Sequence, residues 1–199
     1  MTDNTRGTIE MTAAMVISGT IGWFVVLSGR PVTEVVFWRC LFAIAILLPV
    51  CAAMGLLRRE HATNKQLLLA ALGGVAIVIN WLLLFAAYSR SSISIATAVY
   101  NTQPFMLVGL GALLLREELT RSKVGWLLLS FAGVLLIVLA KPDTSASGSS
   151  YLIGILMSLG AAFCYAVAAL ITKKLKGMPP HLIALVQVLV GTLLLLPVV

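Results

Sequence analysis

Long apolar stretches, each with only a few polar residues, occur seven times along the chain. A helix needs about 20 mostly apolar residues to cross the hydrocarbon core of a bilayer, and these stretches are of roughly that length. We therefore predict seven membrane-spanning helices, at residues 11–28, 35–57, 66–88, 93–115, 124–140, 151–172 and 182–199. The predicted fold class is all-α, a polytopic transmembrane helix bundle.

The composition supports lipid as the main solvent of this chain. Hydrophobic residues make up 60% of the sequence and charged residues only 11%, with a mean hydropathy of +1.06. A soluble domain averages about 25% charged residues, because its surface faces water. The 16 glycines suit helices that associate in lipid by close packing of small residues. The first stretch follows Arg6 as a signal peptide would, but it is long and lacks a clear cleavage site, so we interpret it as a span.

The Lys and Arg residues of the short loops predict the orientation, because cytoplasmic loops carry the excess of positive charge. With the N-terminus in the cytoplasm, ten of these residues lie inside and only Arg30, Arg90 and Lys141 lie outside. Arg39 remains within the second span. We therefore predict a multi-pass protein of the cell inner or plasma membrane. The net charge of +7 then reflects topology, and no nucleic-acid partner is expected.

Catalytic, metal and cofactor chemistry finds little support in the sequence. Cys40, Cys51 and Cys164 lie in apolar runs, so they indicate neither disulfides nor a metal site. The predicted spans contain no His, Asp or Glu. An intramembrane enzyme would lack a general base there, and a proton-coupled transporter would lack the usual carboxylate. We predict no catalytic residue and no cofactor.

A weak internal repeat divides the chain into two parts. Four features of the first part recur near the C-terminus: Gly19–Phe24 with Gly160–Tyr165 and then, after a seven-residue insertion, Pro31 with Pro179, Arg39 with Gln187, and residues 48–50 with 196–198. Five helices separate the copies, so the second copy enters the membrane from the opposite side, as in inverted repeats of transporters. The predicted parts are residues 1–140, a Ser- and Gly-rich linker at 141–150, and 151–199.

Several short motifs occur in an order that resembles a known family. They are Phe37-Trp38-Arg39, Leu84–Tyr88, Gln103-Pro104-Phe105, Leu115–Thr120, Gly125 and Gly133-Val134. The chain resembles the EamA-type members of the drug/metabolite transporter superfamily, although Arg116-Glu117-Glu118 replaces the usual Gly-Glu-Arg turn. The resemblance implies two inverted five-helix repeats and export or import of amino-acid-like or drug-like solutes by alternating access. This chain would then hold one repeat and two helices of the second, as a truncated product or a fragment.

The densest set of polar residues lies in the predicted fourth span. Thr97, Tyr100, Asn101 and Pro104 follow the spacing i, i+3, i+4, i+7 of one helical face, with Gln103 beside them. Pro104 removes a backbone hydrogen bond and frees a carbonyl near Tyr100. A polar face beside an opened helix suits a substrate pocket. The alternative is hydrogen bonding between helices that only holds the bundle together.

Four residues of other spans are further candidates for substrate contact. Arg39 would bind a substrate carboxylate or phosphate, or else extend to the outer interface and pair with Glu34. Asn80 lies in the middle of its predicted span and is a candidate contact. Trp23 has its repeat counterpart near Cys164 and Tyr165, and these residues would line the pocket from both halves or simply pack.

The leading hypothesis is a transporter whose partners are a small-molecule substrate and the lipid bilayer. Trp38 and Tyr88 are interpreted as residues of the aromatic belt at the membrane interface. A non-transporting scaffold or assembly subunit, or an inactive fragment, is the alternative, and an intramembrane enzyme is disfavoured. Whether two chains associate as a homodimer stays open.

Overall fold

The structure of the chain is a computed structural model that describes residues 3–115, 120–139 and 149–199. Within these ranges the chain forms helices joined by short connections, and no strand is present. The helices are α1 (Asp3–Leu27), α2 (Val32–Ala53), the 3₁₀ turn η1 (Arg59–His61), α3 (Asn64–Tyr88), α4 (Ile93–Tyr100), α5 (Gln103–Leu115), α6 (Arg121–Leu139), α7 (Ser149–Lys174) and α8 (Pro180–Leu195). The fold is therefore all-α, as predicted.

Four of the described helices are long and apolar enough to cross a bilayer by length and composition: Gly7–Leu27, Val32–Ala53, Asn64–Tyr88 and Ser149–Lys174. Shorter apolar helices lie at Val124–Leu136 and Pro180–Leu195. Each matches a stretch predicted from the sequence, with ends that differ by a few residues. Residues 141–148 of the predicted linker lie outside the described residues, and residues 149–150 begin α7. The Arg116-Glu117-Glu118 turn also lies outside the described residues.

The predicted fourth span differs from the structure, because residues 93–115 do not form one continuous helix. Asn101 and Thr102 form a turn between α4 and α5. Pro104 has no N–H to donate to the carbonyl one turn earlier, and its ring excludes that carbonyl sterically. The Thr102 carbonyl instead accepts from the N–H of Phe105 at 3.0 Å and of Met106 at 3.3 Å, which starts α5. Pro104 then occupies the first turn of a helix, where proline is tolerated.

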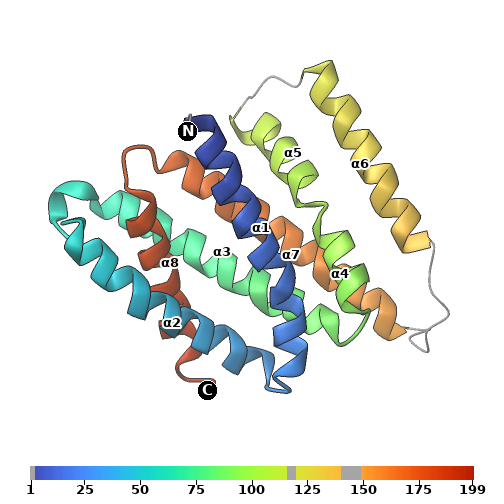
Figure 1. The fold of residues 1–199 in the computed structure, drawn as a ribbon, viewed down its shortest axis with the longest axis horizontal. Coiled ribbons are helices and arrows are strands. Elements are labelled where there is room, and N and C mark those ends of the chain that lie inside the picture. The colour runs from blue at the N-terminus through green and yellow to red at the C-terminus, as the bar shows by residue number, and fades with distance from the viewer. Residues whose placement is uncertain (1–2, 116–119, 140–148) are drawn as a thin grey trace.

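Helix α3 lies at the centre of the bundle and packs along α7 and α8, while α2 packs on α8 (Figure 1). Glycines make these contacts close. A Cβ on Gly74 would lie 2.9 Å from the backbone of Gln187 in α8. A Cβ on Gly191 of α8 would lie 2.7 Å from Cys40 Sγ and 2.8 Å from Val78. Small residues thus set the spacing of the helices, as expected where lipid removes the hydrophobic drive for association.

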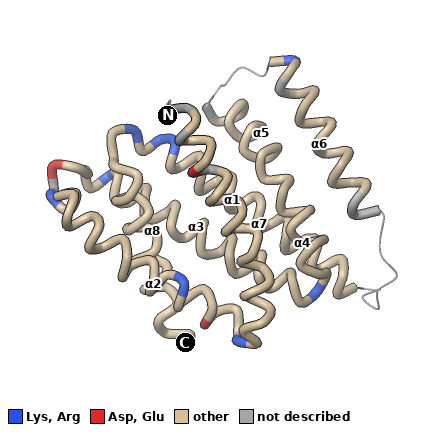
Figure 2. Tube along the Cα trace, in the orientation of Figure 1, with Lys and Arg blue, Asp and Glu red and all other residues tan. Residues whose placement is uncertain are grey.

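Large apolar side chains cover much of the outer surface of the described helices. Leu113 of α5 is 77% exposed and Trp126 of α6 is 70% exposed. In water such surfaces would aggregate, whereas lipid solvates them. Charges gather at the ends instead: Lys and Arg mark the α2–α3 and α7–α8 connections at the same end as the N-terminus, and others lie at the opposite end (Figure 2).

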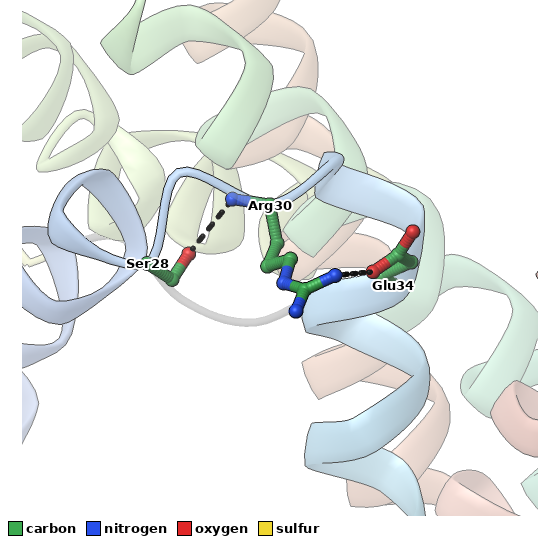
Figure 3. A network of polar contacts seen from close by, with 3 residues as sticks. All are labelled: Ser28, Arg30 and Glu34. Atoms are coloured by element: carbon green, nitrogen blue, oxygen red, sulfur yellow. Dashed lines mark hydrogen bonds and ion pairs between the residues drawn. The ribbon is translucent and has the colours of Figure 1, made fainter.

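The turn between α1 and α2 carries its own polar network (Figure 3). Gly29 has φ +59, a backbone conformation that glycine adopts without strain. The N–H of Arg30 donates to Ser28 Oγ at 3.4 Å, and the Arg30 guanidinium lies 3.7 Å from a carboxylate oxygen of Glu34. Glu34 therefore pairs with Arg30 and not with Arg39, its alternative partner in the sequence.

Candidate functional site

Arg39 of α2 lies against two aromatic rings of α3. Its guanidinium carbon is 4.3 Å from the centre of the Trp81 ring and 5.9 Å from that of Phe85. Trp81 and Phe85 are four residues apart, so they share one face of α3 and stand one above the other. The electron-rich ring faces attract the cation. This contact explains how a charged side chain is held within a span.

A second set of polar and aromatic side chains joins Arg39 through Tyr100. Tyr100, the last residue of α4, interacts electrostatically with Arg39 and lies beside Asn80, while its ring meets Tyr165 of α7 edge-on at 6.2 Å between centroids. Tyr88 of α3 also interacts electrostatically with Arg39 and packs on Phe85 at 5.9 Å. We call this set the Arg39 cluster; it comprises Arg39, Asn80, Trp81, Phe85, Tyr88, Tyr100 and Tyr165.

Several polar atoms in and beside the Arg39 cluster lack partners. Asn80 is 0% exposed, yet neither of its amide atoms makes a hydrogen bond of normal distance and angle within the described residues. The same holds for Thr102 Oγ1 and Gln103 Oε1 at the break between α4 and α5. Buried polar groups are nearly always paired, since leaving one unpaired is costly. Unpaired groups on α3 and at the helix break are suited to hydrogen bonding with a bound solute or water.

The structure distributes the residues predicted from the sequence unevenly. It brings Arg39, Asn80, Tyr100 and Tyr165 into the cluster. Thr97 lies beside Tyr88, at the edge of the cluster. Gln103 is half-buried at the helix break.

Other predicted contacts lie away from the cluster. Asn101 and Pro104 are exposed, and the break between α4 and α5 means that they share no continuous helical face with Tyr100. Trp23 is 64% exposed and stacks on Phe24 of its own helix. Helix α1 approaches α3 through Gly22 instead, where a Cβ would lie 3.4 Å from the Tyr88 ring.

Sequence reasoning missed Trp81, Phe85 and Tyr88 as members of the cluster. Their spacing i, i+4, i+7 places them on one face of α3, and Asn80 directly precedes Trp81, about 100° around the helix from it. That spacing was the available signal. Tyr88, which the sequence places in the interfacial belt, is half-buried here and lies near Arg39.

The described residues offer little metal chemistry. No three His, Cys, Asp or Glu side chains gather there in a way that would hold a metal ion. Cys40 and Cys51 are buried free thiols. Two shallow depressions lie elsewhere, one between α5 and α7 beside Leu114 and Lys174, the other at the α2–α3 connection beside Arg58. Neither includes a residue of the Arg39 cluster, which among the described residues combines a half-buried charge, unpaired polar atoms and aromatic rings.

Comparison with known proteins identifies the family. The EamA-like transporter family matches residues 5–139. The chain belongs to this family. Among relatives of the EamA-like chain, the uncharacterized transporter YxxF of Bacillus subtilis is 32% identical over 192 residues, which is 95% of this chain and 60% of YxxF. Protein RarD of Salmonella typhi is 31% identical over 166 residues, 83% of this chain and 51% of RarD. No solved structure matches.

This EamA-like chain is a multi-pass membrane protein of a transporter family, as its motifs and apolar helices predicted. It spans between half and 60% of the length of these two curated relatives. The family match covers α1 to α6, which corresponds to the first of the two parts that the sequence predicts.

Proposed function

We propose that the protein transports a small metabolite across the inner or plasma membrane by alternating access, with the Arg39 cluster as its binding site. The observation that carries the proposal is the unpaired, fully buried Asn80 beside Tyr100 and the break between α4 and α5. Broken helices lined by polar groups near the membrane centre are typical of substrate sites in secondary transporters. Membership of a transporter family supports the same function.

The proposed architecture is an inverted repeat, with residues 1–140 as the first repeat and 151–199 as the start of the second. Pro31 and Pro179, matched in the sequence, both directly precede a helix, with φ/ψ of −52/140 and −59/135. The contact between α2 and α8, the helices that these prolines begin, supports pairing of equivalent elements across the repeats. Two such units rocking against each other would expose the cluster to either side in turn.

The proposed orientation places the N-terminus in the cytoplasm. It is supported by the gathering of Lys and Arg at the α2–α3 and α7–α8 connections, at the end of the bundle where the N-terminus lies (Figure 2). Single-cysteine labelling with a membrane-impermeant maleimide tests it. A cysteine at Ser28 should react in intact cells and one at Thr63 only after lysis.

Flux in proteoliposomes tests the proposed function. The full gene product is reconstituted and uptake of labelled L-phenylalanine, L-leucine, L-lysine and ethidium is measured against empty vesicles. We expect at least one probe to be carried, with its flux reduced about tenfold or more by Asn80→Ala and by Tyr100→Ala. Thr33→Ala on α2 is the control and should retain flux. Unchanged flux in both cluster variants would place the substrate elsewhere. A folded protein that carries none of the probes would favour a non-transporting scaffold.

A further inference from the structure

Arg39 is held by aromatic rings but has no anionic partner. In the part of the chain that the structure describes, its side chain makes cation–π contacts with Trp81 and Phe85 and no ion pair with a carboxylate. Ring faces compensate a half-buried guanidinium only partly, because their π faces cannot satisfy all of its five N–H groups. The positive charge of Arg39 is therefore orientated and incompletely neutralised.

The surroundings of Arg39 are suited to one negative charge. Tyr88 and Tyr100 lie near it, and their hydroxyl groups are neutral and can donate hydrogen bonds. Glu34, which begins the same helix, pairs with Arg30. A cationic solute would find no counter-charge here among the described residues, whereas an anion would find a guanidinium and donors. Because Arg39 is the one cation in the cluster, a monoanion matches it better than a doubly charged phosphate.

The rest of the cluster sets the kind of molecule that carries this charge. The Asn80 amide has an unpaired N–H₂ and an unpaired carbonyl, so it can recognise a polar group beside the anion. Tyr100 and Tyr165 meet edge-on and present apolar ring surface from α4 and α7. A small organic body would pack on these rings while its charged head reaches Arg39.

We infer that the transported solute is a small organic monocarboxylate whose carboxylate binds the Arg39 guanidinium, with Trp81 and Phe85 orientating the arginine. This inference rests on the proposed function and adds the charge class of the substrate. The planar guanidinium donates two parallel hydrogen bonds to the two oxygens of a carboxylate, a geometry that a lysine cannot reproduce. The bound carboxylate then neutralises the charge of Arg39, which the aromatic rings compensate only partly.

Three probes with one body and different head groups test the inference: 3-phenylpropionate, 3-phenylpropionamide and 3-phenylpropylamine, at neutral pH. Binding is followed by the fluorescence of Trp81 in the purified chain after replacement of the other three tryptophans, Trp23, Trp38 and Trp126, by Phe. The ring of Trp81 touches Arg39, so a ligand that moves the guanidinium changes its emission. We expect the acid to bind about tenfold or more tightly than the amide. The amine should bind no better than the amide.

Variants then assign the preference to Arg39. Arg39→Gln should reduce the difference between acid and amide to about twofold or less, and Arg39→Lys should restore only part of it. Arg90→Gln is the matched control, because Arg90 is exposed and donates to the Ala86 carbonyl at its own helix end. It should retain the full preference. The melting temperature of each variant shows whether it is folded.

The outcomes separate this inference from the proposed function. Equal binding of acid and amide to the wild-type chain, or a preference that persists in folded Arg39→Gln, would overturn the carboxylate site. Binding of none of the three probes would also overturn it. If the amide or the amine is bound and carried in proteoliposomes while the acid is not, transport stands and the charge class is wrong. If the acid is bound but no probe is carried in either assay, the site stands and the transport function fails.

Discussion

Gly74 offers a sharp test of how the bundle is packed. A Cβ at this position would lie 2.9 Å from both the Cα and the carbonyl oxygen of Gln187, and 3.2 Å from Val190 Cβ. Ordinary carbon–carbon contacts are about 3.5–4.0 Å, so the Gly74→Ala methyl group must push α8 away from α3 by several tenths of an ångström. The obstacle is backbone, which cannot rotate aside. Overpacking of this kind costs about 1–3 kcal/mol, and the helix propensity of alanine returns up to about 1 kcal/mol.

The expected net loss for Gly74→Ala is therefore about 1–2 kcal/mol, or a fall in melting temperature of roughly 2–8 °C for a chain of this size. A thermal ramp in detergent with a thiol-reactive dye measures it, because Cys40 and Cys51 are 0% exposed and react only on unfolding. Gly109→Ala in α5 is the control, since nothing lies within 4 Å of its Cβ position. It should keep or raise the melting temperature. A Gly74→Ala protein as stable as the Gly109→Ala protein would refute the close α3–α8 contact.

Substitutions at three further positions report on local structure by the same thermal ramp. Thr63→Ala should cost about 1 kcal/mol, because Thr63 forms a capping box at the start of α3; no change would mean that the cap is not formed. Ser92→Gly should stabilise the protein by up to about 1 kcal/mol, since Ser92 has φ 144 in a region that favours glycine, whereas Ser92→Ala keeps the strain and loses the cap to α4. Equal effects of the two would contradict the strained backbone. Glu34→Gln should change stability by less than about 0.5 kcal/mol, because its pair with Arg30 is exposed; a larger loss would mean that this pair holds α1 against α2.

The helices could be predicted from the sequence because length and apolar composition together define a span. Residues 66–88 were predicted and α3 runs over Asn64–Tyr88. The break in residues 93–115 was foreseen only in part. The sequence located Pro104 and the carbonyl it frees, but a proline inside an apolar run is compatible with either a kink or a full interruption. The Thr102 carbonyl, which accepts from two N–H groups, decides for the interruption.

The sequence predicts those residues of the candidate site whose burial in lipid costs free energy. It does not predict the apolar ones, whose burial in lipid costs little. Arg39 and Asn80 are polar within apolar runs, so each was identified without knowledge of its neighbours. Trp81 and Phe85 are apolar residues at helical spacing, which packing alone explains. Only the approach of Arg39 from another helix gives them a role. Trp23 is predicted as a substrate contact from the internal repeat. A repeat indicates the position of a residue along its helix but not the direction in which its side chain points.

One side of α3 carries both the close glycine contact with α8 and two residues of the Arg39 cluster. Gly73 and Gly74 lie seven residues before Asn80 and Trp81, so the two pairs occupy the same face about 10 Å apart along the axis. At the first level the absence of side chains lets α8 approach until no atom fits between the helices. At the second level the face carries an unpaired amide and a ring that holds a cation. The glycine contact thus fixes the distance between α3 and α8 beside a site that contains unsatisfied polar groups. A close contact next to a site with unpaired polar atoms is the arrangement in which binding energy at the site can reposition one helix against another.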